Sequence, residues 1–327
     1  MAKAILLILL FLAVWPLLGL ARVRYLMSPG HPPSPDSPDE AVSPLVGHVR
    51  ELSVRIGSRS FGEREKLKEA GEYVAEILEK AGYRPEFQRY RHGGGEFVNI
   101  VATLPGTGKD PSWVVAGAHY DTIRGTPGAD DNASAVAVLL EMARLLRGSA
   151  FGRTVKLVFF TLEEPPVFRT EFMGSFVFAR EARDRDQPVH AMVCLEMLGF
   201  FGEGKWRQAY PIPFASLFYP STPDFIAVVG NWKSRKLVET VADSLRRNGP
   251  VPVAALGAPP VVPGLGLSDH RSFWEMGYPA VMVTDTAFYR NPYYHTSGDT
   301  LETLDFRRMG ELVPALVAVV RQLADGS

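Results

Sequence analysis

The amino-acid sequence predicts an α/β sandwich built around a mixed β-sheet. Apolar, strand-like runs alternate with amphipathic, helix-like segments as far as the C-terminus. Several of these runs are apolar throughout, as expected for central strands that are covered on both faces. With 327 residues, 46% of them hydrophobic, the chain is long enough for one large domain with a substantial core.

Charge and cysteine content limit the classes of function. The 35 basic and 36 acidic side chains give a net charge of -1, so there is no electrostatic reason to expect a nucleic acid as partner. Cys194 is the only cysteine, which excludes an internal disulfide and a cysteine-based zinc site. Any metal must therefore be held by His, Asp and Glu.

The N-terminal part of the chain, residues 1–24, contains an apolar segment. Residues 4–21 carry no charge and, at about 18 residues, reach the short limit for spanning a bilayer. We expect an uncleaved membrane anchor. The alternative is a signal peptide cleaved after Ala21, because Gly19 and Ala21 form a small-x-small pattern. Residues 25–44 are rich in Pro and Ser and predict an extended stalk, so the folded domain is expected to span residues 45–327.

Periodicity and turn residues predict the elements of the folded domain in order. Helices are expected at residues 45–56, 64–81, 131–146, 171–183, 233–247 and 306–323. Strands are expected at residues 86–90, 97–104, 112–118, 154–162, 189–195, 224–230, 251–256 and 280–284. A Gly-rich turn at residues 92–95 joins the first two strands as a hairpin.

Residues 200–223 interrupt this pattern with many aromatic side chains and no clear period. A long insertion of this kind inside a compact domain is usually a functional loop or a lid. Two alternatives are an apolar satellite cluster under the loop and a membrane-facing patch.

Imidazole and carboxylate side chains follow the ends of several predicted strands. They are His119, Asp121, Asp131, Glu163, Glu164, Glu196 and, further along, His295. Open α/β sheets place their ligand sites at the carboxyl ends of strands. Adjacent glutamates directly after an apolar strand are costly to bury unless a cation offsets their repulsion. Two divalent cations would do so, and zinc accepts His and carboxylate ligands.

Six segments together resemble the family-28 metallopeptidases, the aminopeptidase Y group of cocatalytic zinc exopeptidases. They are AHYDT, GADDNAS, FFTLEE, CLEMLG, SDHRSFWEMGYPA and YYHTSGDT. This family includes bacterial leucyl aminopeptidases, glutamate carboxypeptidase II and glutaminyl cyclases. The resemblance implies the zinc exopeptidase (phosphorylase/hydrolase-like) fold, a three-layer sandwich in which helices cover both faces of a mixed, twisted sheet. It also implies two zinc ions per chain and a peptide or small amino-acyl substrate.

The same resemblance implies a role for each site residue. The metal ligands would be His119, Asp131, Glu164, Glu196 and His295, with Asp131 bridging the two ions. Asp121 would orient His119, Glu163 would be the general base for a metal-activated water, and Tyr294 would donate to the oxyanion. A cis peptide bond is expected between Asp131 and Asn132. At position 196 the chain departs from the Asp that is common in aminopeptidases.

Plainer roles remain open at this stage. His119 could be a strand-end histidine, Asp121 and Asp131 could be turn or cap residues, and Tyr294 could serve packing alone.

We expect an aminopeptidase that hydrolyses N-terminal peptide bonds. One alternative is a carboxypeptidase, for which Arg124, Arg271 or Arg290 could hold the substrate carboxylate. A glutaminyl cyclase and a non-catalytic, receptor-like ectodomain are the others. The catalytic domain is expected outside the cytoplasm, in the periplasm or extracellular space, either anchored to the membrane or secreted after signal cleavage.

Overall fold

The computed structural model describes residues 39–202, 206–211, 215–217, 219–259 and 261–326. The apolar segment at residues 4–21 and most of the predicted stalk lie outside these residues. Among the described helices, none is both long enough and apolar enough to cross a membrane.

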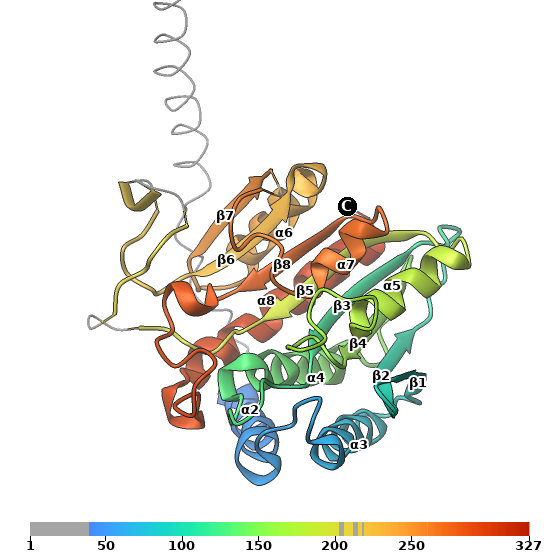
Figure 1. The fold of residues 1–327 in the computed structure, drawn as a ribbon. Coiled ribbons are helices and arrows are strands. Elements are labelled where there is room, and N and C mark those ends of the chain that lie inside the picture. Colours follow the sequence, from blue (N-terminus) through green and yellow to red (C-terminus); the bar gives the residue numbers. More distant parts are fainter. Residues whose placement is uncertain (1–38, 203–205, 212–214, 218, 260, 327) are drawn as a thin grey trace, which may run out of the picture.

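One eight-stranded sheet, in the order β1-β2-β4-β3-β5-β8-β6-β7, forms the centre of the molecule (Figure 1). The strands are β1 (Glu86–His92), β2 (Gly95–Leu104), β3 (Trp113–His119), β4 (Thr154–Phe160), β5 (Val189–Glu196), β6 (Ile226–Asn231), β7 (Val253–Ala258) and β8 (Ala280–Thr284). The central strands β4, β3, β5 and β8 run parallel. β2 and β6 run antiparallel to their neighbours β4 and β8, so the sheet is mixed, as predicted.

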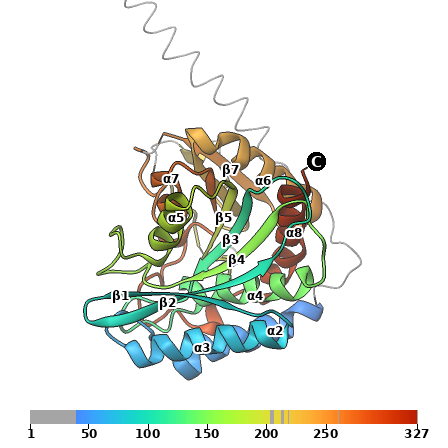
Figure 2. The same ribbon diagram turned by 90° about the vertical axis from the view of Figure 1, so that its right-hand side faces the viewer.

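Helices cover both faces of the sheet, which gives the predicted three-layer sandwich (Figures 1 and 2). They are α2 (Asp39–Arg50), α3 (Arg64–Lys80), α4 (Ala135–Leu146), α5 (Gly174–Asp184), α6 (Arg235–Asn248), α7 (His270–Glu275) and α8 (Phe306–Asp325). The larger core contains the buried residues of α2, α3, α4, α6 and α8, and the smaller core contains those of α5 and α7.

Strand β3 shows how the sequence divides its side chains between these cores. Val114, Ala116 and Ala118 belong to the larger core, whereas Val115 packs with Phe160 and Phe178 in the smaller one. Because successive side chains of a strand point to opposite faces, a strand buried on both sides must be apolar at every position. This is the pattern that predicted a central strand.

The eight predicted strands are all present. The helix predicted from residue 131 begins instead at Ala135, because Asp131 and Asn132 have non-helical backbone angles. Two further differences concern α2 and α7. Helix α2 begins at Asp39, inside the predicted stalk, and continues through Pro44. Leu45 and Val49 are fully buried in the larger core, so packing stabilises this helix in spite of the proline. Helix α7 was not predicted, because six residues are too few to show a helical period.

Candidate metal centre and active site

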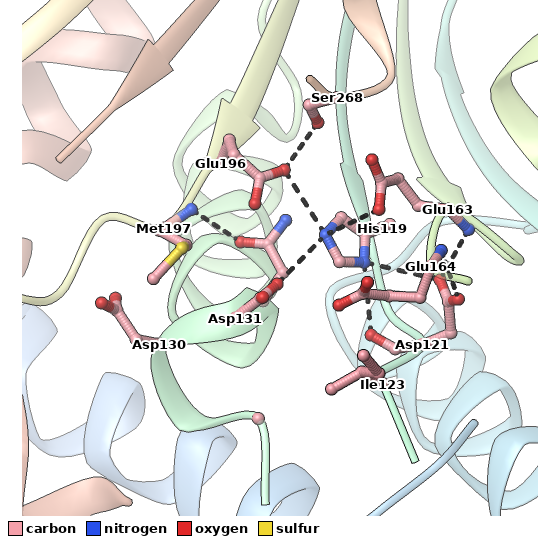
Figure 3. Close-up of polar contacts among 12 residues, drawn as sticks. His119, Asp121, Ile123, Asp130, Asp131, Glu163, Glu164, Glu196, Met197 and Ser268 are labelled. Atoms are coloured by element: carbon pink, nitrogen blue, oxygen red, sulfur yellow. Dashed lines mark hydrogen bonds and ion pairs between the residues drawn. The ribbon is translucent and has the colours of Figure 1, made fainter. Parts of the chain in front are cut away.

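Predicted site residues at or just beyond the carboxyl ends of the parallel strands β3, β4 and β5 lie close together (Figure 3). His119 is the last residue of β3 and Glu196 is the last residue of β5, while Glu163 and Glu164 lie just beyond β4. Asp131 lies in the helical turn η2 (Ala129–Ser134) before α4, and its peptide bond to Asn132 is cis, as expected.

The five predicted ligands form two groups that share Asp131. The first consists of His119, Asp131 and Glu196, and the second of Asp131, Glu164 and His295. His119 Nε2 lies 3.5 Å from Asp131 Oδ1 and 3.4 Å from Glu196 Oε2. His295 Nε2 lies 3.1 Å from Asp131 Oδ2 and 3.3 Å from Glu164 Oε1. Asp131 therefore presents a different carboxylate oxygen to each group.

The donor atoms of these groups fit a bound metal. Among the described residues, His119 Nε2, Glu164 Oε1 and His295 Nε2 are buried without a hydrogen-bond partner. Buried polar atoms of native proteins are rarely left unpaired. Tetrahedral zinc ligands at about 2.1 Å from the ion lie about 3.4 Å from one another, which is close to the spacings in both groups. Each group therefore has the atoms and the spacing for a zinc ion.

Charge in the cluster points the same way. Burial, followed by the charge of Asp131, raises the pKa of Glu164 to about 7. Burial opposes charge on His295, but Asp131 and Glu164 still raise the pKa of its imidazole to about 10. These raised pKa values show that the carboxylates of the cluster carry more negative charge than the two imidazoles can neutralise. A bound cation would neutralise the remainder.

Asp121 lies where it was predicted and makes one further set of contacts. Its Oδ1 is 3.4 Å from His119 Nδ1, which suits the predicted orienting role. The same carboxylate accepts the backbone N–H groups of Glu163 (3.0 Å) and Glu164 (3.1 Å). Asp121 thus connects the end of β3 to the glutamate pair after β4, which the sequence did not predict.

Two further aspartates that the sequence did not single out hold the loop that carries Asp131. The Asp299 carboxylate accepts the backbone N–H groups of Asp130 (2.8 Å) and Asp131 (3.1 Å). The Asp130 carboxylate accepts the Gly199 N–H (2.9 Å) and the Asn291 side-chain amide (2.7 Å). Asp130 lies in the GADDNAS segment and Asp299 in the YYHTSGDT segment. Acidic residues in turns are common as caps, so the sequence alone did not indicate a role for either aspartate.

Ser268 contacts Glu196, the predicted ligand at which the sequence departs from the Asp common in the aminopeptidases it resembles. Its hydroxyl donates to Glu196 Oε2 at 2.6 Å. The same oxygen, Glu196 Oε2, lies 3.4 Å from His119 Nε2. The side chain of Glu196, although one methylene longer than that of Asp, therefore still reaches the cluster.

An apolar cavity of about 140 Å³ adjoins the cluster at Glu196 and Tyr294. Its lining includes small side chains of the sheet, Ala227 and Ala254, together with Phe288. Tyr294 stacks its ring on that of His295, with the ring centroids 3.7 Å apart, and so lies between the cavity and the second ligand group.

The insertion at residues 200–223 forms one wall of this cavity through residues 208–211 and Tyr219. It is attached to the segment after β8, because Ala209 N–H donates to Tyr289 O (2.7 Å) and the Gln208 amide donates to Thr286 Oγ1 (2.9 Å). Tyr210 and Tyr219 also pack on a small buried cluster around Phe225. The described part of the insertion thus borders the site and covers a satellite cluster.

The three arginines considered for a substrate carboxylate lie elsewhere. Arg124 is exposed, and Arg271 pairs with Glu275 at 2.8 Å on α7. Arg290 is buried and donates to Gln208 Oε1 (2.9 Å) and Phe225 O (2.8 Å). None of them lines the described cavity beside Glu196.

Comparison with protein-family models matches residues 99–320 to peptidase family M28. The uncharacterized protein YfbL of Escherichia coli is 38% identical over 280 residues, which are 83% of this chain and 85% of that protein. A protein of Arthroderma otae named as a probable leucine aminopeptidase is 26% identical over 266 residues, 77% of this chain and 63% of the relative. The chain therefore spans less than two thirds of that fungal protein.

Solved structures share the fold. LapB of Legionella pneumophila superposes with a TM-score of 0.70 at 23% identity, covering 91% of this chain and 79% of that one. BSAP, a zinc aminopeptidase from Bacillus subtilis, gives a TM-score of 0.67 at 15% identity and covers 87% and 95%. A glutaminyl cyclase of Fimbriiglobus ruber gives 0.61 at 19% identity and covers 90% and 97%. At these identities the likeness concerns the fold and does not choose between the activities.

Proposed function

Because the chain belongs to peptidase family M28 and is therefore a metallopeptidase, we propose that it is a zinc-dependent aminopeptidase. The observation that carries the proposal is the position of Asp131, which offers one carboxylate oxygen to each of two ligand groups. Such a shared carboxylate suits two metal ions placed side by side. Relatives named as leucine aminopeptidases and a fold neighbour described as a zinc aminopeptidase support the metal and the substrate class.

Glu163 is the proposed general base. Zinc in the two groups would polarise the scissile carbonyl and make a water molecule more acidic at neutral pH. The carboxylate of Glu163 then takes the proton of the attacking water and gives it to the leaving amine. Burial, together with the charges of Glu164 and Glu196, raises the pKa of Glu163 well above its ordinary value, which suits a group that accepts and returns a proton.

Two neighbouring residues complete this mechanism. Asp121 accepts the Glu163 N–H and so fixes the backbone from which the base extends. The Tyr294 hydroxyl is the proposed donor to the oxyanion that forms on the scissile carbonyl.

Two features favour an aminopeptidase over the other exopeptidases of this fold. The free α-amino group of a peptide carries a positive charge, which the carboxylates around Glu163 would attract. A carboxypeptidase needs a cation for the substrate carboxylate, and no arginine or lysine lines the described cavity. That cavity is instead suited to an apolar N-terminal side chain.

The test uses the full chain, loaded with zinc, and a mixture of peptides with free, acetylated or glutaminyl N-termini. Products are followed by mass spectrometry with and without a chelator. We expect chelator-sensitive loss of single residues from free N-termini, fastest for large apolar residues. Loss from C-termini, or loss of ammonia from N-terminal glutamine, would replace the aminopeptidase with a carboxypeptidase or a cyclase. A chain that binds no zinc would contradict the metallopeptidase mechanism.

A further inference from the structure

Arg59 is completely buried, with 0% of the residue exposed. Its charged side chain lies near the carboxylates of the metal cluster. It follows the helical turn η1 (Glu51–Ile56) and the turn residue Gly57. It precedes residues 99–320, the part of the chain that the family model matches, so no motif of the site includes it. A buried charge of this kind needs partners, because an unpaired one would be strongly destabilising.

Three of the partners of Arg59 are backbone carbonyl groups at the two ends of one loop, residues 120–128, which joins β3 to η2. Its Nε donates to Tyr120 O (2.7 Å), directly after His119 in sequence. Its two terminal nitrogens donate to Pro127 O (2.8 Å) and Gly128 O (2.9 Å), just before the turn that carries Asp131. Further bonds reach Leu52 O and Gly57 O, each at 3.2 Å, in its own segment.

Backbone contacts strengthen the same connection. The Arg59 N–H donates to Thr122 Oγ1 at 3.0 Å, and Gly125 N–H donates to Ser58 Oγ at 2.8 Å. Gly128 has a positive φ of 62°, and a Cβ there would lie 2.2 Å from Thr122 Cγ2 and 2.5 Å from Asp131 O. The two ends of this loop therefore meet at Gly128 without room for a side chain, and Arg59 Nη2 would lie 3.2 Å from a Cβ there.

The charge of Arg59 also matters to the cluster. Burial lowers the pKa of Arg59 to about 10, and the nearby carboxylates of Asp299, Asp121, Asp131 and Glu164 oppose that decrease. At neutral pH the guanidinium is still protonated. It thus places a fixed positive charge behind the carboxylates without making a direct ion pair that would compete for their oxygen atoms.

We propose that Arg59 is a positioning residue of the metal centre, which holds together the two ends of the loop between β3 and η2 and so sets the spacing of His119 and Asp131. The inference rests on the proposed function, since it concerns metal binding at these groups. It adds a residue from outside the matched part of the chain to those that determine metal affinity.

The main test replaces Arg59 by lysine in the full chain. Lysine keeps the charge but has one nitrogen in place of the planar, forked guanidinium, so it loses the three separate nitrogens that bond to Tyr120 O, Pro127 O and Gly128 O. Zinc affinity is measured by competition with a chromophoric chelator, and the geometry at the metal by the visible absorption spectrum of the Co²⁺ form. We expect zinc affinity to fall by about 10-fold to 100-fold, as when groups that support metal ligands are changed, with an altered Co²⁺ spectrum. We also expect a lower kcat with little change in KM.

Arg246→Lys is the matched control. Arg246 is also a buried arginine; it donates to Val253 O at 3.2 Å and pairs with Asp243 at 2.8 Å, but it lies on α6 and has no bond to the loop between β3 and η2 in the described structure. R246K should keep the wild-type zinc affinity and Co²⁺ spectrum. If R59K folds and binds zinc as the wild type does, or if R246K loses as much affinity as R59K, the positioning role is wrong. If the wild type itself binds no zinc, the proposed function fails instead.

A second measurement needs no variant and covers the case in which R59K does not fold. Coupling between two sites is reciprocal, so zinc must stabilise the Arg59 segment if that segment stabilises the zinc site. Hydrogen–deuterium exchange of the wild-type chain should slow at residues 57–60 when zinc is added, although none of them is a proposed ligand. Unchanged exchange at these residues would overturn the proposal.

Discussion

Glu163 and Glu164 are adjacent and chemically alike, yet the structure gives them different surroundings. Both backbone N–H groups are held by Asp121. The Glu164 side chain points to His295 at 3.3 Å, within a ligand group, whereas Glu163 Oε2 lies 4.0 Å from His119 Nε2 and outside both groups. Neighbouring residues with the same carboxylate can therefore be given separate roles.

This separation predicts opposite results for two matched variants. Glu163→Gln should lower kcat by about 100-fold to 10,000-fold, because an amide cannot accept the proton of water, while zinc content stays at the wild-type level. Glu164→Gln should lower the zinc content itself, because it changes a proposed ligand. Metal analysis and steady-state kinetics on the same samples decide between these outcomes. Loss of zinc in E163Q would remove Glu163 from the role of base.

Tyr294 and Tyr293 offer a second matched pair. Tyr294→Phe should lower kcat by about 100-fold to 1,000-fold with little change in KM, if the hydroxyl donates to the oxyanion. Tyr293 packs its ring near Phe200 and Trp206, and Tyr293→Phe should retain activity close to the wild type. Equal kinetics for Y294F and the wild type would reduce Tyr294 to a packing role.

At the scale of elements, periodicity predicted the strands better than the segments between them. The central strands were visible because strands buried on both faces are largely apolar, as in β3 and β4, whereas the exposed edge strand β1 was recognised as one arm of a hairpin with a Gly-rich turn. Helix α7 and the first turn of α2 were not predicted. In α7, His270 and Phe273 are buried against other parts of the fold, and in α2 the same holds for Leu45 and Val49. Local sequence patterns do not contain those contacts.

The cavity beside Glu196 yields a prediction about substrate choice. Ala254 of β7 lines it, and Ala254→Leu would fill part of its roughly 140 Å³. We expect the variant to lose activity on peptides with N-terminal Leu or Phe, mainly through a higher KM, while peptides with N-terminal Ala are cleaved as before. The comparison of substrates within one variant controls for general damage. An equal loss on all peptides would show that this cavity does not receive the N-terminal side chain.

For the whole molecule, the buried acidic groups predict how stability depends on pH in the absence of metal. Burial raises the pKa of Glu164, Asp269 and Asp299 to about 7, and that of Asp285 to about 6. These groups bind protons more tightly in the folded state than in the unfolded state, where the pKa is about 4. Their stabilising contribution is complete below about pH 4 and is lost as the pH rises through about 7.

The metal-free protein should therefore have a Tm that falls between about pH 5 and about pH 7, against the usual trend for native proteins. Zinc needs deprotonated ligands, so the rise in Tm on adding zinc should be larger at the higher pH. Calorimetry at several pH values, with and without zinc, measures both effects. Two histidines act in the opposite direction over this range, since burial lowers the pKa of His270 to about 4 and also lowers the pKa of His190. A Tm of the metal-free protein that increases over this range would contradict the prediction.

The site as a whole was predictable only in part. His119, Glu163, Glu164 and Glu196 were found because parallel strands bring their carboxyl ends to one edge of the sheet. Arg59 and Asp299 were not, because they bind backbone groups of loops that are far away in sequence. Any polar residue in a turn could make such bonds, so residue type and spacing alone do not identify these two.

The two ligand groups also differ in their access to solvent. The His119 side chain is 1% exposed, whereas the His295 side chain is 25% exposed, although both face Asp131. A chelator in solution reaches the more open group first. Removal of zinc should then have two kinetic phases, with a labile ion leaving from the His295 side and a slowly exchanging ion retained on the His119 side. Brief dialysis against a chelator would give a half-loaded protein, whose remaining activity measures what a single ion can do.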